Sequence, residues 1–159
     1  MSSAATTTSG TLAKPADPTQ HVDTVKFIGW VAMVVGMFLA ILDIQIVASS
    51  LENIQAGLSA SPDEIGWVQT SYLIAEVVMI PLSGFLSRLI STRWLFVFSA
   101  IGFTIMSIAS AFAWSIESMI WFRAAQGFLG GAMIPTVFAT TYIIFPADKR
   151  NAASVMIGL

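Results

Sequence analysis

A long apolar stretch, Ser118–Phe145, limits the possible folds of this chain more than any other segment. It reads SMIWFRAAQGFLGGAMIPTVFATTYIIF and is long enough to cross a lipid bilayer, since a spanning helix needs roughly 20 mostly apolar residues. The same stretch contains Arg123. An ionisable side chain within a span is rare and is by default a functional candidate. Arg123 is therefore the first residue whose role has to be explained.

The composition places the chain among integral membrane proteins. Hydrophobic residues make up 56% of its 159 residues and charged residues only 10%, which is outside the usual range of soluble domains. The chain has no cysteine and a single histidine, His21, so disulfides and metal or redox centres are not expected. The sequence also shows no nucleophile–base pair or phosphate-binding loop. We therefore expect no enzymatic activity, no cofactor and no nucleic-acid partner.

Four apolar segments are predicted to span the membrane, which gives an all-α integral membrane fold. Residues 1–26 are rich in Ser, Thr and Ala and are predicted to form a disordered tail, and a partial helix bundle follows at 27–159. Its helices are expected at about Phe27–Leu51, Ile65–Leu86, Trp94–Trp114 and Ser118–Phe145, with a fifth beginning at Asn151–Leu159. That last apolar run is too short to cross a bilayer. We therefore expect the sequence to be the first part of a longer protein.

The second predicted helix has a recognisable start signal. Ser61-Pro62-Asp63-Glu64 matches a capping box with proline at the first helical position, so the helix should begin there. Further along, Pro81 lacks a backbone N–H and is expected to kink the helix.

Small and polar residues repeat every seven positions along the first two helices. They are Gly29, Gly36, Asp43 and Ser50 in the first helix and Gln69, Glu76 and Ser83 in the second. A step of seven drifts by only about 20° around a helix, so each set shares one face. Lipid tails offer such a face no hydrogen-bond partner. Each face should therefore pack against another helix or line a cavity.

The basic residues predict how the chain is oriented. Apart from Arg123 they lie before the first span, between the second and third, and after the fourth: Lys14, Lys26, Arg88, Arg93, Lys149 and Arg150. The opposite loops contain acidic residues and no Lys or Arg. By the positive-inside rule, we expect a multi-pass protein of the cytoplasmic (inner) membrane with its N-terminus in the cytoplasm.

In that orientation two of the charges in the spans come to similar depths. At about 1.5 Å per residue, Asp43 lies about 24 Å from the cytoplasmic start of its helix and Arg123 about 8 Å below the outer start of its own. Both would then lie in the outer half of the membrane. Glu76, about 16 Å from the outer start of its helix, would lie near the midplane. Because the charge of a buried carboxyl depends on its distance from an arginine, Asp43 and Glu76 are candidate proton carriers.

Each of these residues also has a purely structural interpretation. Asp43 and Arg123 could form a fixed ion pair that only specifies helix packing. A protonated Glu76 could hydrogen-bond Tyr72, one turn away, or a neighbouring backbone. Gln126 could serve packing or transport.

Glycines are predicted to bring helices close together. Gly127 and Gly131 lie four residues apart in the fourth helix, and small residues at this spacing let two backbones approach. Gly36, on the small and polar face of the first helix, is expected to act in the same way. These positions therefore favour helix packing over ligand contact.

Three motifs, in order along the chain, resemble a family of transporters. Residues 123–132, RAAQGFLGGA, resemble the RxxQGxGxA motif in the fourth helix of drug:proton antiporters of the major facilitator superfamily. Residues 42–47, LDIQIV, look like the LDxTIV signature of the first helix in their EmrB/QacA-type, fourteen-helix branch. Residues 67–73, WVQTSYL, and 80–86, IPLSGFL, are similar to the second helix of that branch. The resemblance covers roughly Gly36 to the end of the chain.

The chain departs from these motifs at several positions. In the first-helix signature Gln45 replaces a Thr, Ala48 an Asn and Glu52 a Pro. The cytoplasmic loop motif of the family, ordinarily GxLADRxGRR, survives only as Gly84, Leu86 and Arg93. Its Asp, Arg and Gly positions are occupied by Arg88, Leu89 and Ser91. The charge relay that relatives build at this loop is therefore in question.

The resemblance implies a helical transporter that works by alternating access, with its first and fourth helices facing a central cavity. It implies that protons and substrate pass beside Asp43, Glu76, Arg123 and Gln126. The implied function is efflux of lipophilic drugs or toxic compounds, driven by the proton gradient, as part of a longer permease. Its implied partners are the lipid bilayer, the lipophilic substrate and, in cells with two membranes, a periplasmic adaptor and an outer-membrane channel. A facilitator carrier for a nutrient or metabolite and a non-transporting four-helix membrane scaffold are the alternatives.

Overall fold

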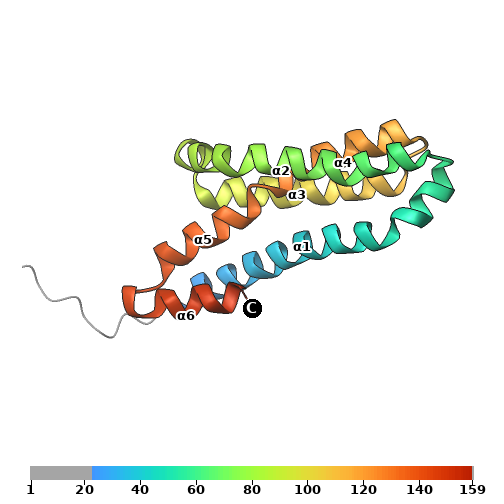
Figure 1. Cartoon of the computed structure of the whole chain (residues 1–159). Coiled ribbons are helices and arrows are strands. Elements are labelled where there is room, and N and C mark those ends of the chain that lie inside the picture. The colour runs from blue at the N-terminus through green and yellow to red at the C-terminus, as the bar shows by residue number, and fades with distance from the viewer. Residues whose placement is uncertain (1–22, 159) are drawn as a thin grey trace, which may run out of the picture.

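The computed structural model describes residues 23–158, which form six helices and no strand (Figure 1). In chain order the helices are α1 (Thr24–Leu58), α2 (Pro62–Ile90), α3 (Thr92–Ala111), α4 (Ile116–Gly130), α5 (Met133–Ile144) and α6 (Ala147–Gly158). Four segments are long and apolar enough to cross a membrane, namely α1, α2, α3 and the stretch that α4 and α5 share. The all-α membrane fold is therefore confirmed. The predicted tail up to residue 22, with His21, lies outside the described residues.

Helix α1 is longer at both ends than the predicted helix Phe27–Leu51. Asp23 caps its start by accepting a hydrogen bond from the backbone N–H of Val25 at 3.3 Å, so the chain from Thr24 onward belongs to the helix and not to the tail. At the other end the helix continues until Ser59, whose left-handed φ of 50° ends it. Hydropathy marks only the part of a helix that is apolar, so it missed these polar extensions.

Helix α2 begins at the predicted capping box. The Ser61 hydroxyl accepts a hydrogen bond from the Glu64 backbone N–H at 3.3 Å, and the Ser61 backbone N–H donates to the Glu64 carboxylate at 2.9 Å. This reciprocal pair satisfies backbone donors that have no partner within the helix. Pro81 lies inside α2, which continues past it to Ile90.

The segment predicted as one helix, Ser118–Phe145, is divided into α4 and α5 at Gly131–Ala132. The cause lies at Pro135, which has no N–H to donate to the carbonyl of Gly131 and whose ring crowds that carbonyl. Figure 1 shows the result. Helix α4 lies beside α2 and α3, whereas α5 turns toward α1 and packs against it while keeping contacts with α3 and α2.

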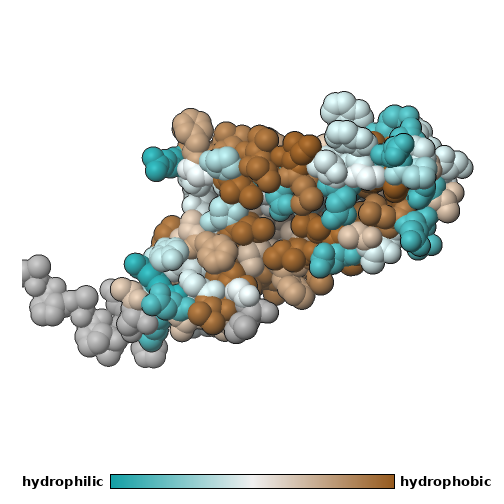
Figure 2. All heavy atoms as spheres, viewed as in Figure 1, coloured by the Kyte–Doolittle hydropathy of each residue, from teal (hydrophilic) through white to brown (hydrophobic). Residues whose placement is uncertain are grey.

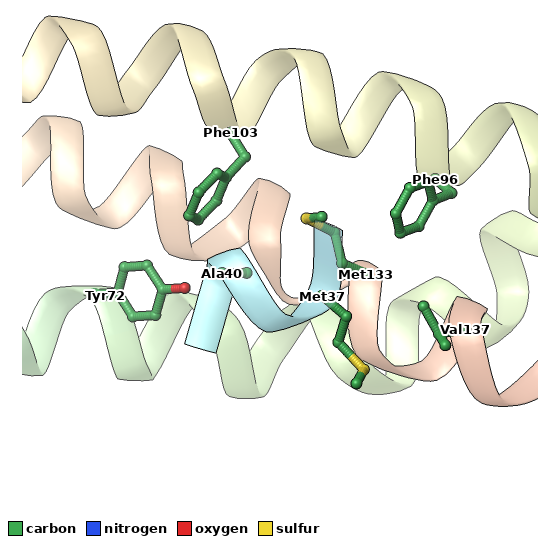
Figure 3. Packing of buried hydrophobic residues seen from close by; sticks show 7 residues of the cluster. All are labelled: Met37, Ala40, Tyr72, Phe96, Phe103, Met133 and Val137. Carbon is green, nitrogen blue, oxygen red and sulfur yellow. The ribbon is translucent and has the colours of Figure 1, made fainter. Parts of the chain in front are cut away.

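One buried cluster joins four of the helices (Figure 3). Its members are Met37 and Ala40 of α1, Tyr72 of α2, Phe96 and Phe103 of α3, and Met133 and Val137 of α5. On the outside, Figure 2 shows hydrophobic residues over the middle of the visible face and hydrophilic residues gathered toward its two ends. Such a surface suits a lipid environment, because the apolar band meets the hydrocarbon and the polar ends meet the headgroups.

Glycines allow the closest approach between helices. A Cβ added at Gly127 of α4 would collide with the backbone carbonyl of Tyr72, and one at Gly131 would lie 2.7 Å from the carbonyl oxygen of Glu76. In α1, a Cβ at Gly36 would lie 3.0 Å from an aromatic ring of α3. Helices α2 and α4 therefore meet backbone to backbone, which no larger side chain permits.

The turn between α2 and α3 contains a backbone conformation suited to glycine. Ser91, the single residue between these helices, has φ 79° and ψ 138°. Side chains with a Cβ rarely adopt such values, and holding one there costs on the order of 1–3 kcal/mol. Ser91 occupies the position at which the family's loop motif has Gly.

We expect Gly127→Ala to destabilise the protein by about 1–3 kcal/mol, because the clash is with backbone that cannot move independently. Thermal unfolding in detergent would measure this. Gly66→Ala is the matched control, since no atom of the described residues lies within 4 Å of a Cβ at that helical position. Equal melting temperatures for the two variants would contradict the close contact between α2 and α4.

We expect Ser91→Gly to raise the stability by about 1 kcal/mol, because glycine adopts positive φ without the Cβ clash. The same unfolding assay would detect the higher melting temperature. Ser87→Gly, inside α2, should instead lower it, because glycine is a poor helix former. A lower melting temperature for Ser91→Gly would show that the turn is not strained.

Candidate functional site

An ion pair between a buried arginine and a partly buried aspartate connects α1 to α4. The Arg123 Nη1 atom donates a hydrogen bond to the Asp43 Oδ2 atom at 2.6 Å. The Arg123 side chain is 1% exposed and that of Asp43 is 19% exposed, so both charges are largely removed from solvent. Among the side chains that the structure describes, it is the only ion pair. The two residues that the depth estimate placed together are therefore in direct contact.

Two further side chains hold the guanidinium group of Arg123. Gln126, one turn later on α4, accepts a second hydrogen bond from Nη1 at 2.8 Å. From α2, the ring of Tyr72 faces the guanidinium, with 4.4 Å between the Arg123 Cζ atom and the ring centroid. A cation over an aromatic face at this distance is attracted by the ring quadrupole. Arg123, a residue of α4, thus contacts α1 through Asp43 and α2 through Tyr72, and Gln126 holds its guanidinium within α4.

The site keeps unused hydrogen-bonding capacity. Within the described residues, the following buried atoms around the ion pair have no hydrogen-bond partner: Arg123 Nε and Nη2, Gln126 Nε2, Tyr72 Oη and Gln69 Oε1. Buried polar groups are normally paired, and leaving one unpaired is costly. Arg123 therefore has donors beyond the one that binds Asp43, and the cluster is not locked into a fully satisfied network.

A cavity of about 460 Å³ lies beside the ion pair, between α1, α3 and α4. Its polar lining residues are Asp43, Ser50, Ser107, Ser110, Arg123 and Gln126. The other lining residues are mostly aliphatic and include Val47, Ile54 and Met119. An apolar wall with a few polar groups is the usual character of small-molecule sites. Asp43 and Ser50, from the small and polar face predicted on the first helix, meet Arg123 and Gln126 of α4 here.

Glu76 is not joined to this ion pair. It is half-buried on α2, one turn after Tyr72, and among the described residues its carboxylate has no ion-pair partner. Its backbone lies close to Gly131, which follows the last residue of α4. The depth estimate had already separated Glu76 from Arg123, and the structure keeps them apart.

The predicted loop residues lie away from the ion pair, where α2 ends and α3 begins. Gly84, Arg88 and Arg93 are exposed, and a Cβ at Gly84 would meet no atom of the described residues within 4 Å. Arg93 lines a second cavity of about 690 Å³, between α1, α3 and α5, together with Lys26 and Gly29.

Sequence reasoning missed the role of Tyr72, which it considered only as a partner of Glu76. A signal was present. At about 1.5 Å per residue, Tyr72 is about 11 Å from the start of the predicted second helix, and Arg123 is about 8 Å from the start of the fourth, which in the predicted orientation begins on the same side. It also missed the bond between the Trp30 indole N–H and the Thr141 hydroxyl, at 2.7 Å, which ties α1 to α5. The division of α4 from α5, which the sequence reasoning did not foresee, positions Thr141 for that bond.

Comparison with known proteins relates the chain to membrane transporters. The Major Facilitator Superfamily profile matches residues 33–159. Over 80% of its length the chain is 54% identical to the "Colistin resistance protein EmrB" of Acinetobacter baumannii. It is 36% identical over 79% of its length to "Multidrug resistance protein 3" of Bacillus subtilis, and 32% identical over 77% to the "Multidrug export protein EmrB" of Escherichia coli K12. The matched regions are 25%, 24% and 24% of those proteins, so the chain spans about a quarter of their length.

We expect Asp43→Ala to destabilise the protein by about 3–5 kcal/mol, because it leaves the Arg123 charge buried without a counter-ion. Asp43→Asn should cost less, since its amide oxygen can still accept the hydrogen bond from Nη1. Thermal unfolding of both variants, with Ser50→Ala on the same face of α1 as the control, tests this. If Asp43→Ala is no less stable than Ser50→Ala, the ion pair contributes nothing to the fold.

Proposed function

The chain belongs to the Major Facilitator Superfamily, and from that premise we propose that the complete protein exports lipophilic compounds in exchange for protons. It is a multi-pass protein of the inner membrane, related to EmrB-type multidrug resistance proteins. The proposal is that the proton gradient supplies the energy and that substrate crosses the membrane by alternating access. The site would lie in the part of the transporter formed by this chain.

The observation that carries this proposal is the buried ion pair between Asp43 and Arg123. When Asp43 binds a proton, the ionic attraction that holds α1 to α4 is lost. Loading and unloading one proton would thereby change how firmly α1 is attached to the α2–α4 pair, which gives the two states that alternating access needs.

Asp43 is the carboxyl we assign to proton coupling, in preference to Glu76. Coupling needs a carboxyl whose charge alters a contact between helices, and Asp43 forms such a contact with Arg123. Glu76 forms no ion pair within the described residues. Gln126 would help to hold the arginine while Asp43 is neutral, because it is bonded to the same Nη1 atom.

The substrate class is proposed from the cavity and from the relatives. The cavity beside the ion pair has mainly aliphatic walls, which suit a lipophilic compound. One relative is named for colistin resistance and others for multidrug resistance or export. A periplasmic adaptor and an outer-membrane channel enter the proposal only through the resemblance to the EmrB/QacA-type branch.

The test is substrate-dependent proton flux in vesicles that contain the complete protein. We expect Asp43→Asn and Arg123→Ala to abolish proton-driven export, measured per amount of folded protein, because each removes one member of the ion pair. Glu76→Gln should retain flux that depends on Asp43. Asp63→Asn, at the exposed start of α2, is the control for loss of an acidic residue.

Full transport by both ion-pair variants would reject the proposal and leave a purely structural role for Asp43 and Arg123. Import of a nutrient or metabolite by the wild-type protein, without proton-driven export, would favour the carrier alternative. Loss of coupling in Glu76→Gln alone would move the proton site from Asp43 to Glu76.

A further inference from the structure

We propose that Tyr72 is a positioning residue for Arg123, and that its ring keeps the guanidinium on the α2–α4 pair when Asp43 is neutral. This inference rests on the proposed function for its consequence in transport. Its physical content, a ring that carries a buried cation, can be tested without transport. It places Arg123 on the closely packed α2–α4 pair and Asp43 on α1, which contacts that pair less.

Tyr72 is itself held firmly in place. It is 1% exposed, within the cluster shown in Figure 3. Its carbonyl lies against Gly127, where a Cβ would collide with it. One residue earlier, the Ser71 hydroxyl bonds the backbone carbonyl of Ile120 on α4 at 3.3 Å. The ring therefore keeps its place relative to α4, which carries Arg123.

Arg123 contacts two parts of the molecule, the α2–α4 pair and α1. Gln126 and Tyr72 belong to α4 and α2, which pack against each other extensively (Figure 1). Asp43 belongs to α1, which packs less closely with them. If the bond to Asp43 is lost, Arg123 still has the amide oxygen of Gln126 and the face of Tyr72. The guanidinium therefore stays in the same place and can bind the Asp43 carboxylate again.

The ring matters more once Asp43 is neutral. A lone cation is attracted more strongly to an aromatic face than one whose charge is already balanced by a carboxylate, and the attraction is largest where water is excluded. The other charged group near the ring is Glu76, on α2 itself, which forms no ion pair within the described residues. No charged residue of α3 lies in this part of the helix, since its sole charged residue, Arg93, stands in its first turn.

The ring of Tyr72, and not its hydroxyl, positions the guanidinium of Arg123. Among the described residues the Tyr72 hydroxyl has no hydrogen-bond partner, whereas the ring centroid lies 4.4 Å from the Arg123 Cζ atom. Phenylalanine would therefore replace tyrosine without loss of the cation–π contact. Leucine would fill part of the space but present no π face.

The experiment compares Tyr72→Phe and Tyr72→Leu in the complete protein, each in the wild-type background and with Asp43→Asn as a mimic of the neutral carboxyl. We expect Tyr72→Leu to lower the melting temperature by about 3 °C more in the Asp43→Asn background than in the wild type. Tyr72→Phe should show no such difference. Phe103→Leu, a loss of an aromatic ring in the same cluster, should cost the same in both backgrounds.

An equal cost of Tyr72→Leu in the two backgrounds, or a Tyr72→Phe variant that behaves as Tyr72→Leu does, would overturn the proposal. If Tyr72→Leu does not fold, Tyr72→Met, which fills more of the volume without a π face, replaces it in the same comparison. These measurements do not depend on transport, so they stand even if the exporter proposal fails.

A second measurement links the contact to transport. In vesicles that show proton-driven export, we expect about tenfold slower export for Tyr72→Leu and restoration by Tyr72→Phe. A merely structural ring would give a loss that Phe103→Leu reproduces at equal melting temperature. That result would overturn the positioning role.

Discussion

Burial of the Arg123 charge is the constraint on which the rest of the site depends. A guanidinium in a membrane-spanning segment is tolerated only where other groups compensate it, and this chain supplies three from three helices: a carboxylate from α1, an amide from α4 and an aromatic face from α2. Each partner is useful only at short distance. The need to compensate one charge therefore fixes how α1, α2 and α4 approach one another.

Close packing makes that approach possible. Membrane helices gain little from the hydrophobic effect against each other, so contact of backbones and polar side chains has to hold them together. Gly127 and Gly131 supply the contact between α4 and α2, and Pro135 turns α5 toward α1, where Trp30 bonds Thr141. The result is a closely packed α2–α4 pair and an α1 that contacts this pair less, with the Asp43–Arg123 ion pair as one of the contacts that hold α1 in place.

Much of the fold was predictable from local rules. Hydropathy located the spans and the Ser61 to Glu64 box located the start of α2. The division of the last long span at Gly131–Ala132 was not foreseen, although proline chemistry explains it. The ends of α1 were missed because its polar turns carry no hydropathy signal. Depth arithmetic brought Asp43 to Arg123, since both positions follow from counting residues along straight helices.

The sequence by itself determined that this is a helical membrane protein, which residues are charged within its spans, and how far along its helix each lies, because composition and helical rise are local properties. Tertiary structure alone decided what lies beside Arg123. Counting along a helix gives a position along its axis but not the rotation about that axis, so the sequence left the Asp43–Arg123 pair as one possibility and did not predict the Tyr72 ring over the guanidinium. The packing of the helices decided both contacts, and the glycine contacts of α4 with α2 brought Tyr72 to Arg123.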